Sequence, residues 1–161
     1  MNFSRLRPAN FPTIRWVQLA QLYSNVPHLF ATLLGSESIT SSVLSEIGVS
    51  HFWKTHYTFT KESTKREKRL STSFIELLFI NTIIPFYFCY QKAMGKDPSE
   101  KVIHWIRSLP AEKNAFSKGF SAINVSVEDA LDSQALIQLK QQYCELKKCL
   151  LCPVGVYLLK Q

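Results

Sequence analysis

The sequence is informative first for what it has little of. Glycine supplies only 5 of the 161 residues, which excludes collagen-like and glycine-linker architectures. No acidic residue precedes Glu37, although three arginines lie in that stretch. No uninterrupted apolar run approaches the roughly 20 residues that a membrane-spanning helix needs. Residues 1–10 are polar and basic with no apolar run behind them, so we expect no secretory signal.

The patterns that carry familiar enzyme chemistry are also missing. There is no glycine-rich phosphate loop, no His-x-x-x-His pair, no close pair of carboxylates and no serine, histidine and acid in a hydrolase order. The histidines are scattered, and isolated histidines more often pack than catalyse. We therefore expect a chain without a catalytic centre of its own.

What is present predicts helices almost throughout. Apolar residues make up 46% of the chain and charged residues 19%, which is enough to bury a core. Proline, serine and aspartate stand where helices begin, and glycine where they end. Further helices are predicted to start at Pro110 and at Asp132 or Ser133. The pattern favours an all-α fold, an irregular multi-helix bundle that forms a single domain over residues 1–161.

The longest predicted helix is central, over residues 71–94, and Pro85 should bend it because the ring removes one backbone hydrogen bond. Its middle, residues 74–90, is apolar and aromatic, but Glu76, Asn81 and Pro85 interrupt it. This favours a buried core helix over a membrane span, so no membrane partner is expected.

Basic charge is in excess, with 19 Lys and Arg against 12 Asp and Glu, a net charge of +7. Residues 61–69, KESTKREKR, hold five basic and two acidic side chains. Basic clusters attract phosphate backbones through counterion release, and the neighbouring Trp53, His56 and Tyr57 offer rings for stacking on bases. The alternative is an ordinary solvated loop. On the nucleic-acid interpretation the candidate phosphate contacts are Arg5, Arg7, Arg15, Lys65, Arg66, Lys68 and Arg69.

Three of the four cysteines fall within nine residues near the C-terminus, a poor layout for a disulfide framework and more typical of a reducing, cytoplasmic setting. Thiolates bind zinc or iron–sulfur clusters, and the candidate metal ligands are Cys144, Cys149 and Cys152. The fourth ligand stays open among Cys89 and the histidines, which are His28, His51, His56 and His104. The alternative is that small apolar thiols fill a helix junction.

Four blocks of sequence carry a family resemblance: RPANFPTIRWVQLAQLYSNVP, HFWKTHYTF, LLFINTIIPFYFCYQ and SQALIQLKQQYCELKKCLLCPVG. Together they resemble the C-terminal region of a bacterial family known only as a domain of unknown function. The positions that carry the family pattern are Arg7, Pro8, Asn10, Pro12, Arg15, Asn81, Pro85, Asn114, Ser133, Gln134, Tyr143, Cys144, Lys147, Cys149, Cys152 and Gly155.

The resemblance implies a particular origin for the chain. Longer members of the family carry an N-terminal half that is similar to a PD-(D/E)xK nuclease core, and that half is absent here. The chain is then expected to be a detached or truncated C-terminal helical portion without the catalytic centre. Cys89 lies outside the family pattern, which counts against it as a fourth metal ligand.

These observations favour a non-catalytic accessory module that binds nucleic acid or a protein partner. The protein partner that the resemblance implies is the nuclease-like domain. Two alternatives stay open: a domain that binds zinc or an iron–sulfur cluster through its cysteines, and a structural scaffold that forms a homo-oligomer.

Overall fold

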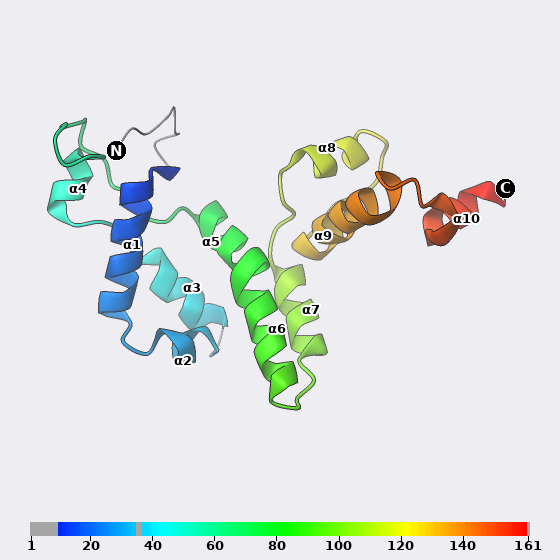
Figure 1. The fold of residues 1–161 in the computed structure, drawn as a ribbon, viewed down its shortest axis with the longest axis horizontal. Helices are drawn as coiled ribbons and strands as arrows, with labels where there is room; N and C mark the ends of the chain where they lie inside the picture. The colour runs from blue at the N-terminus through cyan, green and yellow to red at the C-terminus, as the bar shows by residue number, and fades with distance from the viewer. Residues whose placement is uncertain (1–9, 35–36, 161) are drawn as a thin grey trace. The chain divides into compact units, whose positions relative to one another are not determined.

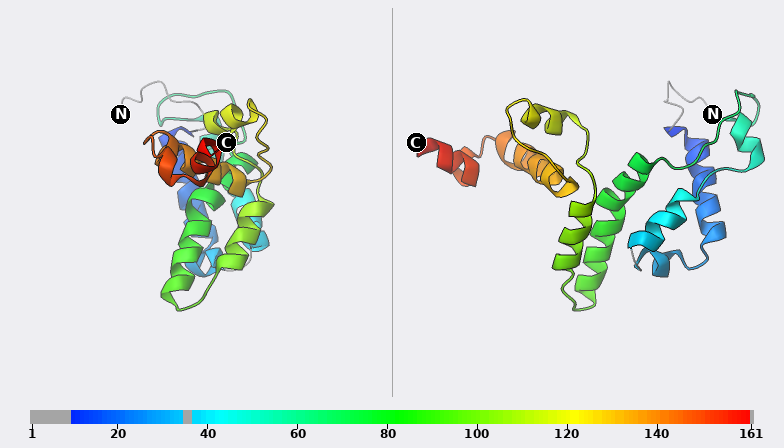
Figure 2. Two further views of the ribbon diagram at one scale, coloured as in Figure 1. Left: turned by 90° about the vertical axis from the view of Figure 1, so that its right-hand side faces the viewer. Right: turned by 180° about the vertical axis from the view of Figure 1, so that it is seen from behind.

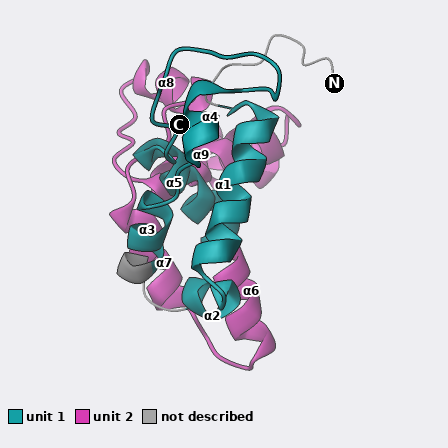
Figure 3. Cartoon of the chain, turned by 90° about the vertical axis from the view of Figure 1, so that its left-hand side faces the viewer, with its two compact units in different colours: residues 1–83 teal, residues 84–161 magenta. Residues whose placement is uncertain are grey.

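The computed structural model describes residues 10–34 and 37–160, and within them the chain is all-α, as predicted. No β-strand occurs in this part of the chain, only isolated bridges between His56 and Glu62 and between Pro110 and Asp129. Figure 1 shows the order of the helices. The chain divides into two compact units, residues 1–83 and 84–161, coloured separately in Figure 3. Whether they form one domain stays a prediction.

Unit 1 is built around the first helix. Its elements are α1 (Pro12–Asn25), α2 (Leu29–Leu33), α3 (Glu37–Ser45), α4 (His51–Thr55), α5 (Thr72–Leu78) and the π-helical turn η2 (Phe79–Ile83). Between α4 and α5 the chain runs without helix through residues 57–71, which include the basic residues 61–69.

Local signals and a few distant contacts explain the elements of unit 1. Pro12 stands at the first position of α1, where its missing N–H costs nothing. The helix buries Ile14, which with Leu44, Ile47 and Ile75 contributes to the core. After α3 the chain continues through Gly48, whose N–H donates to Gln21 Oε1 of α1 at 2.7 Å.

Unit 2 begins with a helical hairpin. Its elements are α6 (Ile84–Ala93), α7 (Ser99–Ser108), α8 (Ala115–Ser121), α9 (Ala130–Leu139), the π turn η3 (Lys140–Cys144), the 3₁₀ turn η4 (Cys149–Leu151) and α10 (Pro153–Leu159). Helices α6 and α7 lie side by side in Figures 1 and 2. Gly95 makes the turn between them at φ +73°, a conformation that favours glycine. The rings of Tyr87 and Trp105 pack with their centroids 4.8 Å apart.

Two predicted helix starts in unit 2 were wrong. Pro110 opens no helix but pairs with Asp129 in a β-bridge, and α8 begins instead at Ala115 with Asn114 as its N-cap. There the Asn114 side chain and Ser117 form a reciprocal capping box, which satisfies two otherwise free N–H groups. Helix α9 is capped by Asp129, which accepts a hydrogen bond from the Asp132 N–H at 2.9 Å.

The central helix runs from Thr72 to Ala93 and contains a π-helical turn near its proline. The bend expected at Pro85 stays a prediction. The π turn of η2 ends two residues before Pro85. The ring of Pro85 removes an N–H and crowds the carbonyl four residues earlier, and a π turn accommodates such a break in the α-helical ladder. Asn81, within this turn, donates through Nδ2 to the carbonyl of Leu77 at 3.1 Å.

The same helix is long and apolar enough to cross a membrane, judged by length and composition alone. Its most apolar stretch has a mean hydropathy of 1.5, and 33% of that stretch is buried in the protein. A core helix of a globular protein has the same composition. The buried side chains of this helix recur at steps of one, three and four residues, and they are Ile75, Phe79, Ile80, Ile83, Ile84 and Tyr87. That the helix serves as a core helix stays a prediction.

The hairpin of unit 2 makes its stability depend on pH. Asp97 Oδ1 accepts hydrogen bonds from the Ser99 hydroxyl at 2.7 Å, from Lys92 Nζ at 3.0 Å and from the Ser99 N–H at 3.3 Å. The hydrogen bond from the Ser99 hydroxyl, followed by that from Lys92, lowers the pKa of Asp97 from 3.8 to about 2. The folded carboxylate therefore favours folding above pH 3.8, and this contribution is lost as the pH falls toward 2.

We expect Asp97→Asn to remove that part of the pH dependence of the free energy of unfolding. Urea unfolding from neutral pH down to about pH 2 measures it, and identical pH profiles of wild type and variant would contradict this expectation.

Gly155 is required by a close approach between two C-terminal elements. A Cβ at this position of α10 would lie only 2.4 Å from the carbonyl oxygen of Cys149 in η4.

We expect Gly155→Ala to lower the stability of α10 by about 1–3 kcal/mol, the usual cost of overpacking. The matched control is Gly119→Ala in α8, where no atom lies within 4 Å and about 0.4–1 kcal/mol of stabilisation is expected. Hydrogen exchange of the helix amides measures both, and equal protection of α10 in wild type and Gly155→Ala would refute the first expectation.

Candidate nucleic-acid interface

Arg15 carries a positive charge that no acid among the described residues neutralises. Its guanidinium donates to Gln18 Oε1 and to Asn10 Oδ1, each at 2.9 Å, and both partners are neutral amides. The Cζ atom lies 3.6 Å from the centroid of the Phe74 ring. Within the described part of the chain Arg15 takes part in no ion pair. Burial lowers the pKa of this guanidinium, because the charge is partly removed from water without a counterion.

Gln18 joins α1 to the basic segment, which is defined as residues 61–69. Its side chain is buried, and while Oε1 accepts from Arg15, Nε2 donates to the carbonyl oxygen of Lys68 at 2.8 Å. The amide therefore orients Arg15 and holds the basic segment beside α1 at the same time.

Lys68 has a structural role, although it belongs to the predicted phosphate contacts. Its residue is only 8% exposed, and Nζ donates to the carbonyls of Trp53 at 2.6 Å and His56 at 2.7 Å. The ammonium also lies 3.6 Å from the centroid of the Tyr57 ring. Burial, followed by the nearby charge of Arg66, lowers the pKa of Lys68. Lys68 thus fixes the basic segment to the end of α4.

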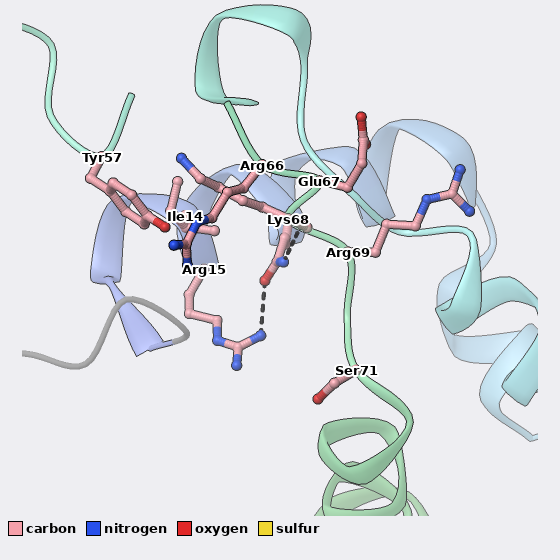
Figure 4. Close-up of a pocket in the computed structure, with 9 residues that line it drawn as sticks. Ile14, Arg15, Tyr57, Arg66, Glu67, Lys68, Arg69 and Ser71 are labelled. Atoms are coloured by element: carbon pink, nitrogen blue, oxygen red, sulfur yellow. Dashed lines mark hydrogen bonds between the residues drawn. The ribbon is translucent and has the colours of Figure 1, made fainter. Parts of the chain in front are cut away.

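The other predicted cations of the basic segment are exposed. Arg69 lies 3.7 Å from the Glu46 carboxylate, and Glu67 is paired with Lys54 at 2.7 Å. Lys65 and Arg66 form no ion pair with any described residue. Figure 4 shows the Glu67 and Arg69 side chains directed away from the Arg15 guanidinium.

An open pocket of about 220 Å³ lies where α1 meets the basic segment (Figure 4). Arginines on two sides supply positive charge, and the Tyr57 and Ser71 hydroxyls add polar groups. The pocket's acid, Glu67, binds Lys54, so the local charge is positive. Such a pocket suits an anion such as a phosphate. Its lining is Ile14, Arg15, Gln18, Tyr57, Arg66, Glu67, Lys68, Arg69 and Ser71.

The structure brings four of the seven predicted phosphate contacts to this pocket: Arg15, Arg66, Lys68 and Arg69. Lys65 adjoins it in sequence. Arg5 and Arg7 lie outside the described residues.

Aromatic rings lie close together in the chain just before the basic segment, and only some of them were predicted from the sequence. We call Phe52, Trp53, His56 and Phe59 the ring cluster. Phe52 stacks on His56 with centroids 4.0 Å apart, and Phe59 meets Trp53 at 5.1 Å. Tyr57, predicted to stack on bases, is instead engaged by Lys68 and by the Phe11 ring at 5.3 Å. Phe59 was missed, although it lies only two residues before the basic segment.

The C-terminal cysteines are not arranged as a metal site. Cys152 is buried, whereas Cys144 and Cys149 are exposed. The helix ends soon after Cys144, where Lys147 adopts φ +53°, and Cys149 begins a separate 3₁₀ turn. Among the described residues no group of three or more His, Cys, Asp or Glu side chains is placed to hold a metal ion. Zinc or iron–sulfur binding stays a sequence prediction without support from this geometry.

The described residues form an all-α chain with a cationic pocket on its N-terminal unit. The chain belongs to the family described as "Protein of unknown function (DUF2851)", which it matches over residues 1–115. The match includes all of unit 1 and extends to Ala115 at the start of α8, so it stops short of the cysteine-rich end. Neither a curated protein nor a solved structure matches the chain.

The roles of two neighbouring lysines can be separated by one pair of variants. Lys68→Met would leave the carbonyls of Trp53 and His56 without their ammonium donor, so we expect a loss of about 1–3 kcal/mol in the free energy of unfolding. Lys65→Met, at an exposed position of the same segment, should change it by no more than about 0.5 kcal/mol. Urea denaturation followed by circular dichroism measures both, and equal stability of the two variants would show that Lys68 has no structural role.

Proposed function

We propose that this protein is a non-catalytic accessory module that binds the phosphate backbone of a nucleic acid through the pocket between α1 and the basic segment. Arg15 and Arg66 contact phosphate oxygens, and Lys65 adds long-range attraction at the rim. Lys68 takes no part in contact because its ammonium holds the segment in place.

The observation that carries the proposal is the uncompensated charge of Arg15. Proteins usually pair a half-buried guanidinium with a carboxylate, because desolvation of an unpaired charge is costly. Here two neutral amides and a phenyl ring hold the guanidinium, so its position is fixed and its charge is left for an external anion. A planar guanidinium matches a phosphate group with two parallel hydrogen bonds.

The resemblance to longer family members supplies the context of the proposal. In those members the module would lie in the same chain as the PD-(D/E)xK nuclease-like half and would hold nucleic acid for it. We place the module in the cytoplasm, because all four cysteines are free thiols and a reducing compartment preserves them.

The test is binding of fluorescent oligonucleotides, both DNA and RNA, followed by polarisation over a series of salt concentrations. Wild-type protein should bind at low salt, with an affinity that falls linearly on a double-logarithmic plot. The double variant Lys65→Gln/Arg66→Gln should bind about ten-fold more weakly, and its salt slope should be smaller by about 1–2 because each lost phosphate contact removes about 0.7–0.9.

The matched control removes the same charge elsewhere. Lys113 and Lys118 of unit 2 are exposed and take part in no ion pair with the described residues. Lys113→Gln/Lys118→Gln should therefore bind nearly as wild type. No binding of any oligonucleotide at low salt, or an equal loss in the control, would refute the proposal.

A further inference from the structure

The ring cluster beside the pocket is an aromatic surface outside the core. Phe59 is 76% exposed and Phe52 41% exposed, so both rings are open to solvent, Phe59 the more so. The rings nevertheless hold one another: Phe52 stacks on His56 at an interplanar angle of 10°, and Phe59 packs edge-on against Trp53 at 69°. A surface of mutually packed rings offers flat faces at little further cost in side-chain entropy.

The backbone around the cluster is fixed by hydrogen bonds rather than left as a loose loop. His56 pairs with Glu62 in an antiparallel bridge, and the Ser63 N–H donates to the Thr55 carbonyl. The Arg66 N–H donates to the Lys54 carbonyl at 3.0 Å. The basic segment therefore runs back along α4, which carries Phe52 and Trp53, with His56 directly after its last residue.

This arrangement interleaves aromatic faces and cations on one local structure. Phe59 precedes Lys61 by two residues, so their Cα atoms lie at most about 7 Å apart. Arg66 lies in the part of the loop that runs back along α4. It lines the pocket, and its N–H donates to the Lys54 carbonyl of α4. A ligand that contacts both the ring cluster and the pocket must carry flat apolar rings and negative charges in alternation.

We propose that the nucleic acid bound by this protein is single-stranded, with one or more unpaired bases stacked on Phe59 and Phe52 while the adjoining phosphates occupy the pocket. This inference rests on the proposed function and specifies its substrate class. Bases in a duplex are stacked on their neighbours and offer no free face, whereas every unpaired base has one. Helix α4 is also only five residues long and presents rings, unlike the recognition helices that read a major groove.

The experiment compares three probes: a single-stranded oligonucleotide, the blunt duplex of the same sequence, and inorganic polyphosphate, which has charge but no bases. Wild-type protein should bind the single strand at least about ten-fold more tightly than the duplex. Phe59→Ala should weaken single-strand binding about five-fold or more while leaving the salt slope and polyphosphate binding unchanged, because only stacking is lost. Phe59→Trp should restore single-strand binding.

The matched control is Tyr23→Ala on α1, which removes another exposed ring of the same unit, 62% exposed, and should bind as wild type. Equal affinity for single strand and duplex, or no effect of Phe59→Ala, would overturn this inference while the proposed function still stands. Absence of binding to all three probes would overturn both. Binding of polyphosphate as tight as that of the single strand would show an anion site without base recognition and would refute the stacking.

Discussion

The arrangement of unit 1 depends on the burial of one ammonium group. Lys68 reaches back across its own loop to the carbonyls at the end of α4, and it covers the face of Tyr57. Without that contact the basic segment has few apolar side chains with which to hold its position. The pocket is positively charged because Lys68 holds the basic segment in place through these carbonyls, while Arg66 and Arg69 of the same segment stay exposed.

The basic segment has an ordered backbone although its cations repel one another. Five cations in nine residues repel one another, and such runs are commonly disordered. Two features oppose the repulsion here: Arg69 lies 3.7 Å from the Glu46 carboxylate, and the Lys68 ammonium donates to two backbone carbonyls. Lys61, Lys65 and Arg66 are left as exposed cations of the segment that form no ion pair with a described residue, and Arg66 lines the pocket with Arg15. An ordered backbone beneath exposed charge is what a binding surface requires, since little entropy is then lost when a ligand arrives.

Helix existence and the positions of several ends were predictable because their signals are local. Pro12 and Pro153 start α1 and α10, Ser71 caps α5 and Gly95 ends the central helix. The prediction failed where two local signals compete, as at Pro110, which joins a bridge while Asn114 supplies the better cap. It could not assign a role to Lys68, because a lysine within a basic run looks like its neighbours. Its partners are fixed by contacts 12 to 50 residues apart in sequence, which no spacing rule reveals.

The neutral amide of Gln18 has one more consequence. A carboxylate at that position would neutralise Arg15 and oppose the Lys68 carbonyl, and an aliphatic side chain would release both partners. Since amides do not titrate and a guanidinium stays protonated throughout the physiological range, acidification within that range does not change the charge of Arg15 or of the amide that orients it. The affinity of Arg15 for a phosphate is therefore expected to stay the same between acidified and neutral surroundings and to fall as the salt concentration rises.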